Sequence, residues 1–260
     1  MASLKEVKGR IASVNNTRKI TSAMKMVASA KLHKAQAAIE SMLPYERRLH
    51  HILTDFMSNC TEVTSPFIVK REVKKVAVVV FASNTSLCGG FNANVIRHLV
   101  DLLAEYKPLG LENILVFPVG KKVADAVRKL GFRIEGDFQH MADKPSYQEA
   151  ADLAADLMKR FLHGDVDKVE LLYNHFKSTA SQILTRETYL PIDLNNEKKE
   201  EERTIDYILE PSAEELMQEM LPKVLRMKMF TVLLDSNAAE HAARTMYFQN
   251  LPKRFCHLPY

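Results

Sequence analysis

The chain has 260 residues, of which 47% are hydrophobic and 26% charged, a balance that excludes wholesale disorder and allows one large or two small domains. The formal net charge is only +4, which excludes a uniformly basic surface and confines any basic excess to part of the chain. Three cysteines without a CxxC pair give no support to a disulfide framework or a zinc site, and no apolar run approaches the roughly 20 residues that a membrane-spanning helix needs.

The first forty-odd residues, from Met1 to about Leu43, carry one apolar stripe with gaps of three and four residues. This spacing predicts a continuous amphipathic helix, which at 1.5 Å per residue would be roughly 60 Å long. Helical periodicity continues after Pro44 and ends near Asn59. A helix of this length cannot bury its stripe alone, so the pattern predicts a partner helix. The stripe consists of Leu4, Val7, Ile11, Val14, Met24, Ala28, Leu32, Ala35, Ile39 and Met42.

The other faces of this helix are strongly basic, and Glu6 is the one acidic residue before Glu40. A solvated helix usually mixes both signs of charge, so two interpretations stay open. The first is a solvated basic face. The second is a helix that lies against something acidic: a nucleic acid, an anionic membrane surface or the acidic loops of another protein. The basic residues are Lys5, Lys8, Arg10, Arg18, Lys19, Lys25, Lys31 and Lys34.

The middle of the chain alternates short β-branched runs with amphipathic segments. Strands are expected at 75–82, 113–119, 166–174 and 180–190, with a possible further strand at 133–138. Helices are expected at 92–106, 121–130 and 146–162, the last with Ser146 and Glu149 at capping-box spacing. This alternation predicts a doubly wound, Rossmann-like α/β domain and allows an antiparallel edge strand.

The last part of the chain returns to helical periodicity. Pro211 and Ser212 open one helix, and Pro222 is expected to start a further one, where the N–H that proline lacks is not needed. Small residues and methionines then recur three or four positions apart as far as Met246. The sequence thus predicts an α/β protein in which an antiparallel coiled coil of the N- and C-terminal helices carries an inserted α/β domain. The expected division is 1–65, 66–205 and 206–260.

Candidate catalytic chemistry is sparse. Cys88, Gly89 and Gly90 follow the first strand and precede a helix, the place where doubly wound folds bind phosphates, but the run matches neither GxxxxGK[ST] nor GxGxxG. Two adjacent glycines more often make a tight turn, and a small buried thiol is the simpler interpretation of Cys88. The nine histidines show no metal-ligand spacing, and no paired carboxylates stand out. The residues therefore indicate no enzyme, no cofactor and no metal.

Three stretches are specific enough to compare with known families: Leu4–Ala28, Leu87–Asn92 after a hydrophobic strand, and Ala239–Arg244 in the second long helix. In this order they resemble the gamma subunit of F-type ATP synthase, of the bacterial type, and the resemblance covers about residues 1 to 246. It implies a non-catalytic rotor shaft in the central stalk. Such a shaft couples transmembrane proton flow to ATP synthesis or hydrolysis at sites on the catalytic subunits, and it regulates ATPase activity.

The resemblance also implies partners. The basic face with Lys25, Lys31 and Lys34 would meet acidic loops of the alpha and beta subunits of the catalytic ring. The foot of the shaft around Tyr207 would dock on the membrane rotor ring and on the small epsilon-type subunit, and no nucleic acid is implied. The expected partner-contact residues are Arg10, Arg18, Lys19, Met24, Lys25, Lys31, Lys34, Tyr207, Glu240 and Arg244.

Residues 247–260 depart from the pattern of this family. They contain two prolines and no apolar period, so the second long helix is expected to end near Asn250, as in a shortened or altered C-terminus. Antiparallel pairing would then leave roughly the first twenty residues of the first helix without a partner. The apolar residues expected to be exposed there are Leu4, Val7, Ile11 and Val14.

No signal or transit segment precedes the first helix, which predicts a bacterial protein that is peripheral on the cytoplasmic side of the plasma (inner) membrane. Two other functions stay open on the residues alone. One is a phosphate- or nucleotide-binding α/β protein with a helical dimerisation arm, which requires a titratable cluster beside Cys88. The other is a nucleic-acid-binding coiled coil, whose affinity would fall steeply with salt.

Overall fold

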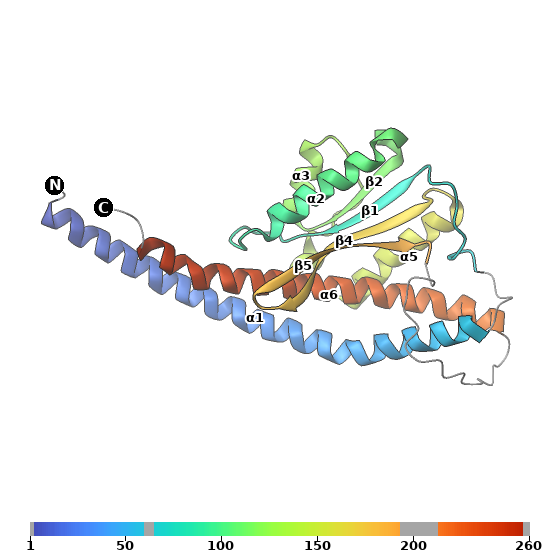
Figure 1. The fold of residues 1–260 in the computed structure, drawn as a ribbon, viewed down its shortest axis with the longest axis horizontal. Helices are drawn as coiled ribbons and strands as arrows, with labels where there is room; N and C mark the ends of the chain where they lie inside the picture. The colour runs from blue at the N-terminus through green and yellow to red at the C-terminus, as the bar shows by residue number, and fades with distance from the viewer. Residues whose placement is uncertain (1–2, 60–64, 193–212, 257–260) are drawn as a thin grey trace.

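Two long helices, α1 (Leu4–Asn59) and α6 (Ala213–Cys256), run side by side in opposite directions along the whole molecule in the computed structural model, which describes residues 3–59, 65–192 and 213–256 (Figure 1). With 56 residues, α1 is about 84 Å long at 1.5 Å per residue. An α/β domain lies against one side of this pair (Figure 1). The predicted antiparallel pair of terminal helices with an inserted α/β domain is therefore confirmed.

The prolines interrupt these helices less than expected. α1 passes through Pro44, and α6 runs unbroken through Pro222 and Pro252 to Cys256. The predictions that a new helix starts at Pro222 and that the last helix ends near Asn250 were therefore both wrong. A proline inside a helix removes one hydrogen bond and crowds the preceding turn, at a cost of about 3 kcal/mol, but the helix can bend around it. At Pro222 that cost is offset by packing, because Leu221 and Leu225 beside it are buried in the main core.

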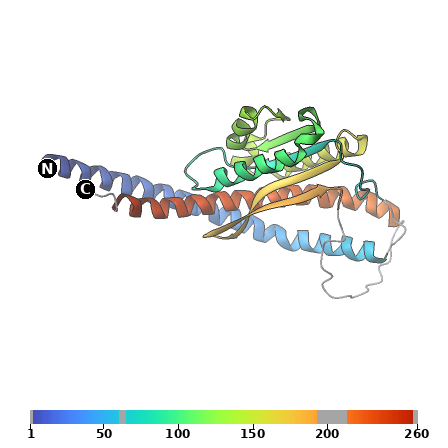
Figure 2. The ribbon, with the colours of Figure 1, turned by 45° about the horizontal axis from the view of Figure 1, so that its top comes forward.

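The N-terminal end of α1 extends beyond the end of α6, and both views show this free segment (Figures 1 and 2). Its apolar side chains lie in solvent, as expected for a stripe without a partner helix. The exposed residues are Leu4, Val7, Ile11 and Val14.

The α/β domain is built on a five-stranded sheet with the strand order β3-β2-β1-β4-β5. The first four of these strands are parallel, and β5 is an antiparallel edge, so the doubly wound prediction is confirmed together with its edge strand. The strands are β1 (Val76–Phe81), β2 (Ile114–Val119), β3 (Arg133–Ile134), β4 (Lys168–Ser178) and β5 (Ser181–Leu190). The helices are α2 (Phe91–Tyr106), α3 (Lys121–Lys129), α4 (Gln139–Asp143) and α5 (Tyr147–His163).

Local differences from the sequence prediction are small. β3 has two residues instead of the six expected at 133–138, and α4 follows it where no helix was expected. Ser146 stands at the N-cap of α5 but makes no side-chain capping bond. The expected partner in that capping box, Glu149, instead lies 3.0 Å from Nδ1 of His140, so a nearby imidazole competes with the backbone for the carboxylate.

The sheet separates two hydrophobic cores, because successive side chains of a strand point to opposite faces. One core joins β1 to α2 and α3 through residues such as Val80, Leu99 and Val127. The other joins the opposite face to α5 and α6 through residues such as Leu157 and Met229. α6 is therefore both one half of the helical pair and a covering helix of the sheet.

Candidate functional site on the helical pair

The basic face of α1 is open to solvent along its length. Every basic residue in the expected contact set on this helix is exposed except Lys25, which is half-buried, and Met24 is exposed beside them. The exposed members are Arg10, Arg18, Lys19, Lys31 and Lys34. An elongated surface of one charge sign attracts acidic partners through the summed field of its side chains.

The seam between the two helices is made of small residues on α6. Leu32 and Ala35 of α1 pack against Ala238 and Ala242, which are fully buried. Alanines at this position let the two backbones approach closely, so a larger side chain would push the helices apart. The small side chains of this seam therefore allow a short distance between the axes of α1 and α6.

Two residues expected to contact partners, Glu240 and Arg244, turn inward. Arg244 donates from Nη2 to Oε1 of Glu240 at 2.6 Å and from Nη1 to the carbonyl oxygen of Ser86 at 2.5 Å. Glu240 is only 8% exposed, and its burial raises the pKa of the carboxyl, which the charge of Arg244 opposes. In this chain the two side chains join α6 to the loop that follows β1.

His241 sits beside this pair and is also buried, at 7% exposure. Burial lowers the pKa of His241 to about 4, and the positive charges of Lys31 and Arg244 act in the same direction. Its Nδ1 has no hydrogen-bond partner among the described residues. The imidazole is therefore neutral at neutral pH. The charge of Lys31 on α1 thus influences the protonation of a buried side chain on α6.

The loop after β1 is held in shape by Asn92, a residue to which sequence reasoning gave no role of its own. Its Nδ2 donates to Oγ of Ser83 at 2.8 Å and to the thiol of Cys88 at 3.1 Å, while its Oδ1 accepts from the Ser83 N–H at 3.0 Å. Leu87 takes a left-handed φ of 70°, which costs a non-glycine residue energy and persists only in a well-fixed loop. Cys88 is a buried free thiol within this network, as expected for a small packed side chain.

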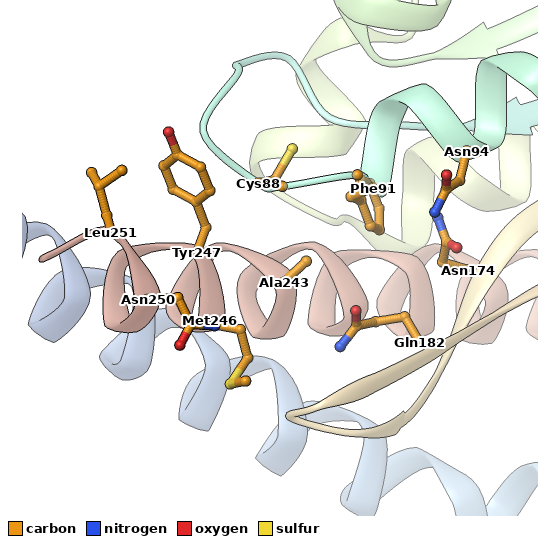
Figure 3. A pocket seen from close by; sticks show the side chains of 12 residues that line it. Cys88, Phe91, Asn94, Asn174, Gln182, Ala243, Met246, Tyr247, Asn250 and Leu251 are labelled. Atoms are coloured by element: carbon orange, nitrogen blue, oxygen red, sulfur yellow. The ribbon is translucent and has the colours of Figure 1, made fainter. Parts of the chain in front are cut away.

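A cleft of about 260 Å³ opens where this loop and the β4–β5 hairpin meet the C-terminal part of α6 (Figure 3). It lies at the carboxyl end of the sheet, where phosphate binding was the alternative interpretation of the two glycines. None of the described side chains that line it is acidic or basic, so the cluster that the alternative function requires is not found among them. The residues that line the cleft are Cys88, Gly89, Gly90, Phe91, Asn94, Asn174, Gln182, Ala243, Met246, Tyr247, Asn250 and Leu251.

Tyr207, the residue expected at the foot of the shaft, lies outside the described residues. Within the described part of the chain, no three His, Cys, Asp or Glu side chains gather as metal ligands. No helix in these same segments combines the length and apolarity that crossing a bilayer demands.

A two-helix rod formed from both ends of the chain, with an α/β domain packed mainly on α6, is the architecture of a mechanical subunit of the stalk type. The family model "ATP synthase" matches residues 3–253. Curated relatives named ATP synthase gamma chain are 80% identical in Phocaeicola vulgatus and 60% identical in Bacteroides thetaiotaomicron, each alignment covering 96% of this chain and 87% of the relative. The chain belongs to the ATP synthase gamma chain family.

Solved structures share the same fold at low sequence identity. A chain from the central stalk and c-ring of the Tetrahymena thermophila mitochondrial ATP synthase matches with a TM-score of 0.62 at 20% identity, covering 89% of this chain and 99% of that one. A rotor chain of the Euglena gracilis mitochondrial enzyme matches with a TM-score of 0.58 at 17% identity, covering 96% and 90%. As a gamma chain, this protein is a non-catalytic rotor subunit of the central stalk in a membrane-associated enzyme.

Proposed function

We propose that the exposed basic face of α1 is the bearing surface on which this shaft turns against acidic loops of the alpha and beta subunits. The support is the exposure and single sign of its charges, because Arg10, Arg18, Lys19 and Lys34 are all exposed along the part of the helix nearest the N-terminus. Solvated ion pairs of this kind are individually weak, about 0–1 kcal/mol, so they can form and break as the shaft rotates. Met24 adds a flexible apolar contact to the same surface.

The observation that carries this proposal is the one-sided charge of α1. From Lys5 to Lys34 all charged side chains of this helix except Glu6 are basic, and most of them are exposed. A surface of one charge sign favours contact with an acidic partner. The N-terminal part of α1 is therefore suited to lie among acidic loops at the centre of a ring of catalytic subunits.

The opposite end of the helical pair would be the foot of the shaft. α1 ends at Asn59 and α6 begins at Ala213 at this end, and Tyr207 precedes α6 in sequence. We propose that the foot meets the membrane rotor ring and the epsilon-type subunit on the cytoplasmic side of the bacterial inner membrane. The functional units would be 1–65, 66–205 and 206–260, and nucleic acid would not be a partner.

Coupling then follows from asymmetry. A helical pair with a domain on one side has no rotational symmetry (Figure 2), so it presents different contacts to each of three equivalent catalytic sites. A shaft can shift the open and closed states of a site only by the difference in its contacts with the two states. Proton flow would turn the shaft for ATP synthesis, hydrolysis would turn it backwards, and its angle would regulate ATPase activity.

Charge reversal tests the bearing surface. Arg18→Glu combined with Lys19→Glu should lower ATP-driven proton pumping of the complex assembled with this chain, and weaken co-purification with the alpha and beta subunits as salt rises. Lys129→Glu is the matched control, because Lys129 is an exposed lysine on α3, away from the helical pair. Unchanged pumping and co-purification in the double variant, at all salt concentrations, would contradict the proposal.

A further inference from the structure

We infer that Asp235 is a positioning residue that fixes the α/β domain to the shaft, by holding Phe176 of the β4–β5 hairpin against the seam of the two long helices. The inference rests on the proposed function, because it concerns how torque passes between the domain and the helical pair. It begins with the geometry of one carboxylate. Oδ2 of Asp235 lies 2.6 Å from Nδ1 of His175, and Oδ1 accepts the backbone N–H of Phe176 at 2.8 Å.

These bonds meet the hairpin where the sheet no longer supports it. β1 pairs with β4 only from Lys168 to Leu172, and beyond that point β4 and β5 continue as a two-stranded ribbon. A two-stranded hairpin is marginally stable in water without further packing. The Phe176 N–H points to α6, so Asp235 supplies the acceptor that a neighbouring strand supplies elsewhere in the sheet.

The side chain of Phe176 lies at the junction that the hairpin reaches. It packs against the seam of Leu32, Ala35, Ala238 and Ala242, which joins α1 to α6. The same ring also packs against a second cluster, formed by the loop after β1 and α6: Cys88, Phe91, Ala239 and Ala243. This aromatic ring of the α/β domain therefore lies at the junction where α1 and α6 pack together.

The main core already packs the sheet and α5 against α6, and two further hydrogen bonds join the domain to that helix. Asn237 donates to the carbonyl oxygen of Ala142 at 2.9 Å, and the hydroxyl of Tyr189 donates to that of Leu225 at 2.8 Å. Both bonds end on α6, whereas Phe176 packs against the cluster that joins α6 to α1. Releasing the hairpin would leave the domain on α6 through the main core but would loosen its support at the seam with α1, so that hydrolysis would continue with less torque delivered.

The first test is hydrogen exchange on the isolated full chain. Asp235→Ala should raise exchange in residues 174–184 by about tenfold or more, the ratio expected when a hydrogen bond to a charged group is lost. Asp235→Asn keeps an oxygen that can accept the Phe176 N–H, so it should stay closer to the wild type. Unchanged hairpin exchange in Asp235→Ala would overturn the positioning role.

The second test measures protons pumped per ATP hydrolysed by the complex assembled with each variant. Asp235→Ala and Phe176→Ala should lower this ratio at least about twofold while ATP hydrolysis continues, since the lost contacts join the domain to the shaft. Glu170→Gln is the control: it disrupts a buried ion network inside the α/β domain, and should leave the ratio unchanged.

The outcomes separate the two claims. An equal ratio in Asp235→Ala and wild type, or an equal loss in Glu170→Gln, would overturn the inference. A wild-type chain that joins the complex but supports no pumping would instead overturn the proposed function. In that case the exchange experiment still decides whether Asp235 holds the hairpin.

Discussion

Glu170 offers the sharpest test of what holds the α/β domain together. Its carboxylate is 2% exposed and accepts from Nζ of Lys168 at 2.5 Å, from the hydroxyl of Tyr106 at 2.8 Å and from Nε of Arg186 at 3.0 Å. Arg186 also donates to Glu105 at 2.7 Å on the same helix as Tyr106. One acidic side chain on β4 thus ties together β5 and the end of α2.

Glu170→Gln removes the charge but keeps the size. Loss of one member of a buried ion pair typically costs about 3–5 kcal/mol, because the other charge is left buried. Here the side chains of Lys168 and Arg186 are 25% and 38% exposed, so water can rehydrate part of their charge. We therefore expect a loss of about 2–3 kcal/mol in the free energy of unfolding at pH 7.

The pH dependence gives the prediction its sign. Burial alone would raise the pKa of Glu170, but hydrogen bonds from Arg186, Lys168 and Tyr106 outweigh burial and hold it below the usual value of 4.5. A carboxyl with a lowered folded-state pKa stabilises the fold fully above its unfolded-state pKa, and this stabilisation is lost as the pH falls through the folded-state pKa. The difference between wild type and Glu170→Gln should be constant from pH 8 to about 5 and shrink at lower pH.

Urea unfolding followed by circular dichroism measures this difference. With a slope of about 1–3 kcal/mol per molar urea, the midpoint should fall by about 1 M at pH 7. Glu219→Gln is the control, since its ion pair with Lys223 joins two exposed side chains of one helix and should be worth well under about 1 kcal/mol. The reasoning would be refuted if Glu170→Gln lost less free energy of unfolding than Glu219→Gln does. It would also be refuted if the loss in Glu170→Gln stayed the same at acid pH.

Three further predictions concern single positions. Gly120 has φ 117°, and a Cβ there would overlap the carbonyl oxygen of Ala82, so Gly120→Ala should cost about 3 kcal/mol in thermal or urea unfolding. Tyr189→Phe removes the buried hydroxyl that bonds Leu225 and should cost about 1 kcal/mol in the same assay. The pKa of His241 is about 4 in the folded chain and about 6.5 in the unfolded chain, so as the pH falls the unfolded chain takes up this proton first. Up to about 3 kcal/mol of stability should disappear as the pH falls from 6.5 to 4, and His241→Gln should flatten this slope.

The order of helices and strands could be predicted because each element shows a characteristic residue pattern within its own short stretch of sequence. The three- and four-residue spacing of Leu32, Ala35 and Ile39 defines one helix face, and the β-branched run of β1 defines a strand covered on both sides. The prediction of a helix boundary at Pro222 was wrong because proline locally disfavours the interior of a helix. In the folded chain, burial of the neighbouring residues in the main core outweighs this local preference.

The interactions at the junction could not be predicted in the same way. The bonds from Asp235 to the hairpin and from Arg244 to Ser86 join residues about 60 and 158 positions apart. No local pattern fixes such pairings, which depend on how the sheet is placed on α6. Glu240 and Arg244 could be singled out as important from the resemblance, but their inward direction appears only when the loop after β1 is in position.

The division of labour between the two long helices follows from their burial. α6 is buried nearly all round from Met229 to Thr245, because one side covers the sheet and the other meets α1. A helix buried on all sides cannot be amphipathic, and a helix with one packed face must show its others to solvent or to partners. α6 is therefore the structural axis that carries the domain, and α1 is the outer rod whose basic faces remain available. Under the proposed function, such a shaft would exchange partner contacts along α1 while the main core holds the domain on α6.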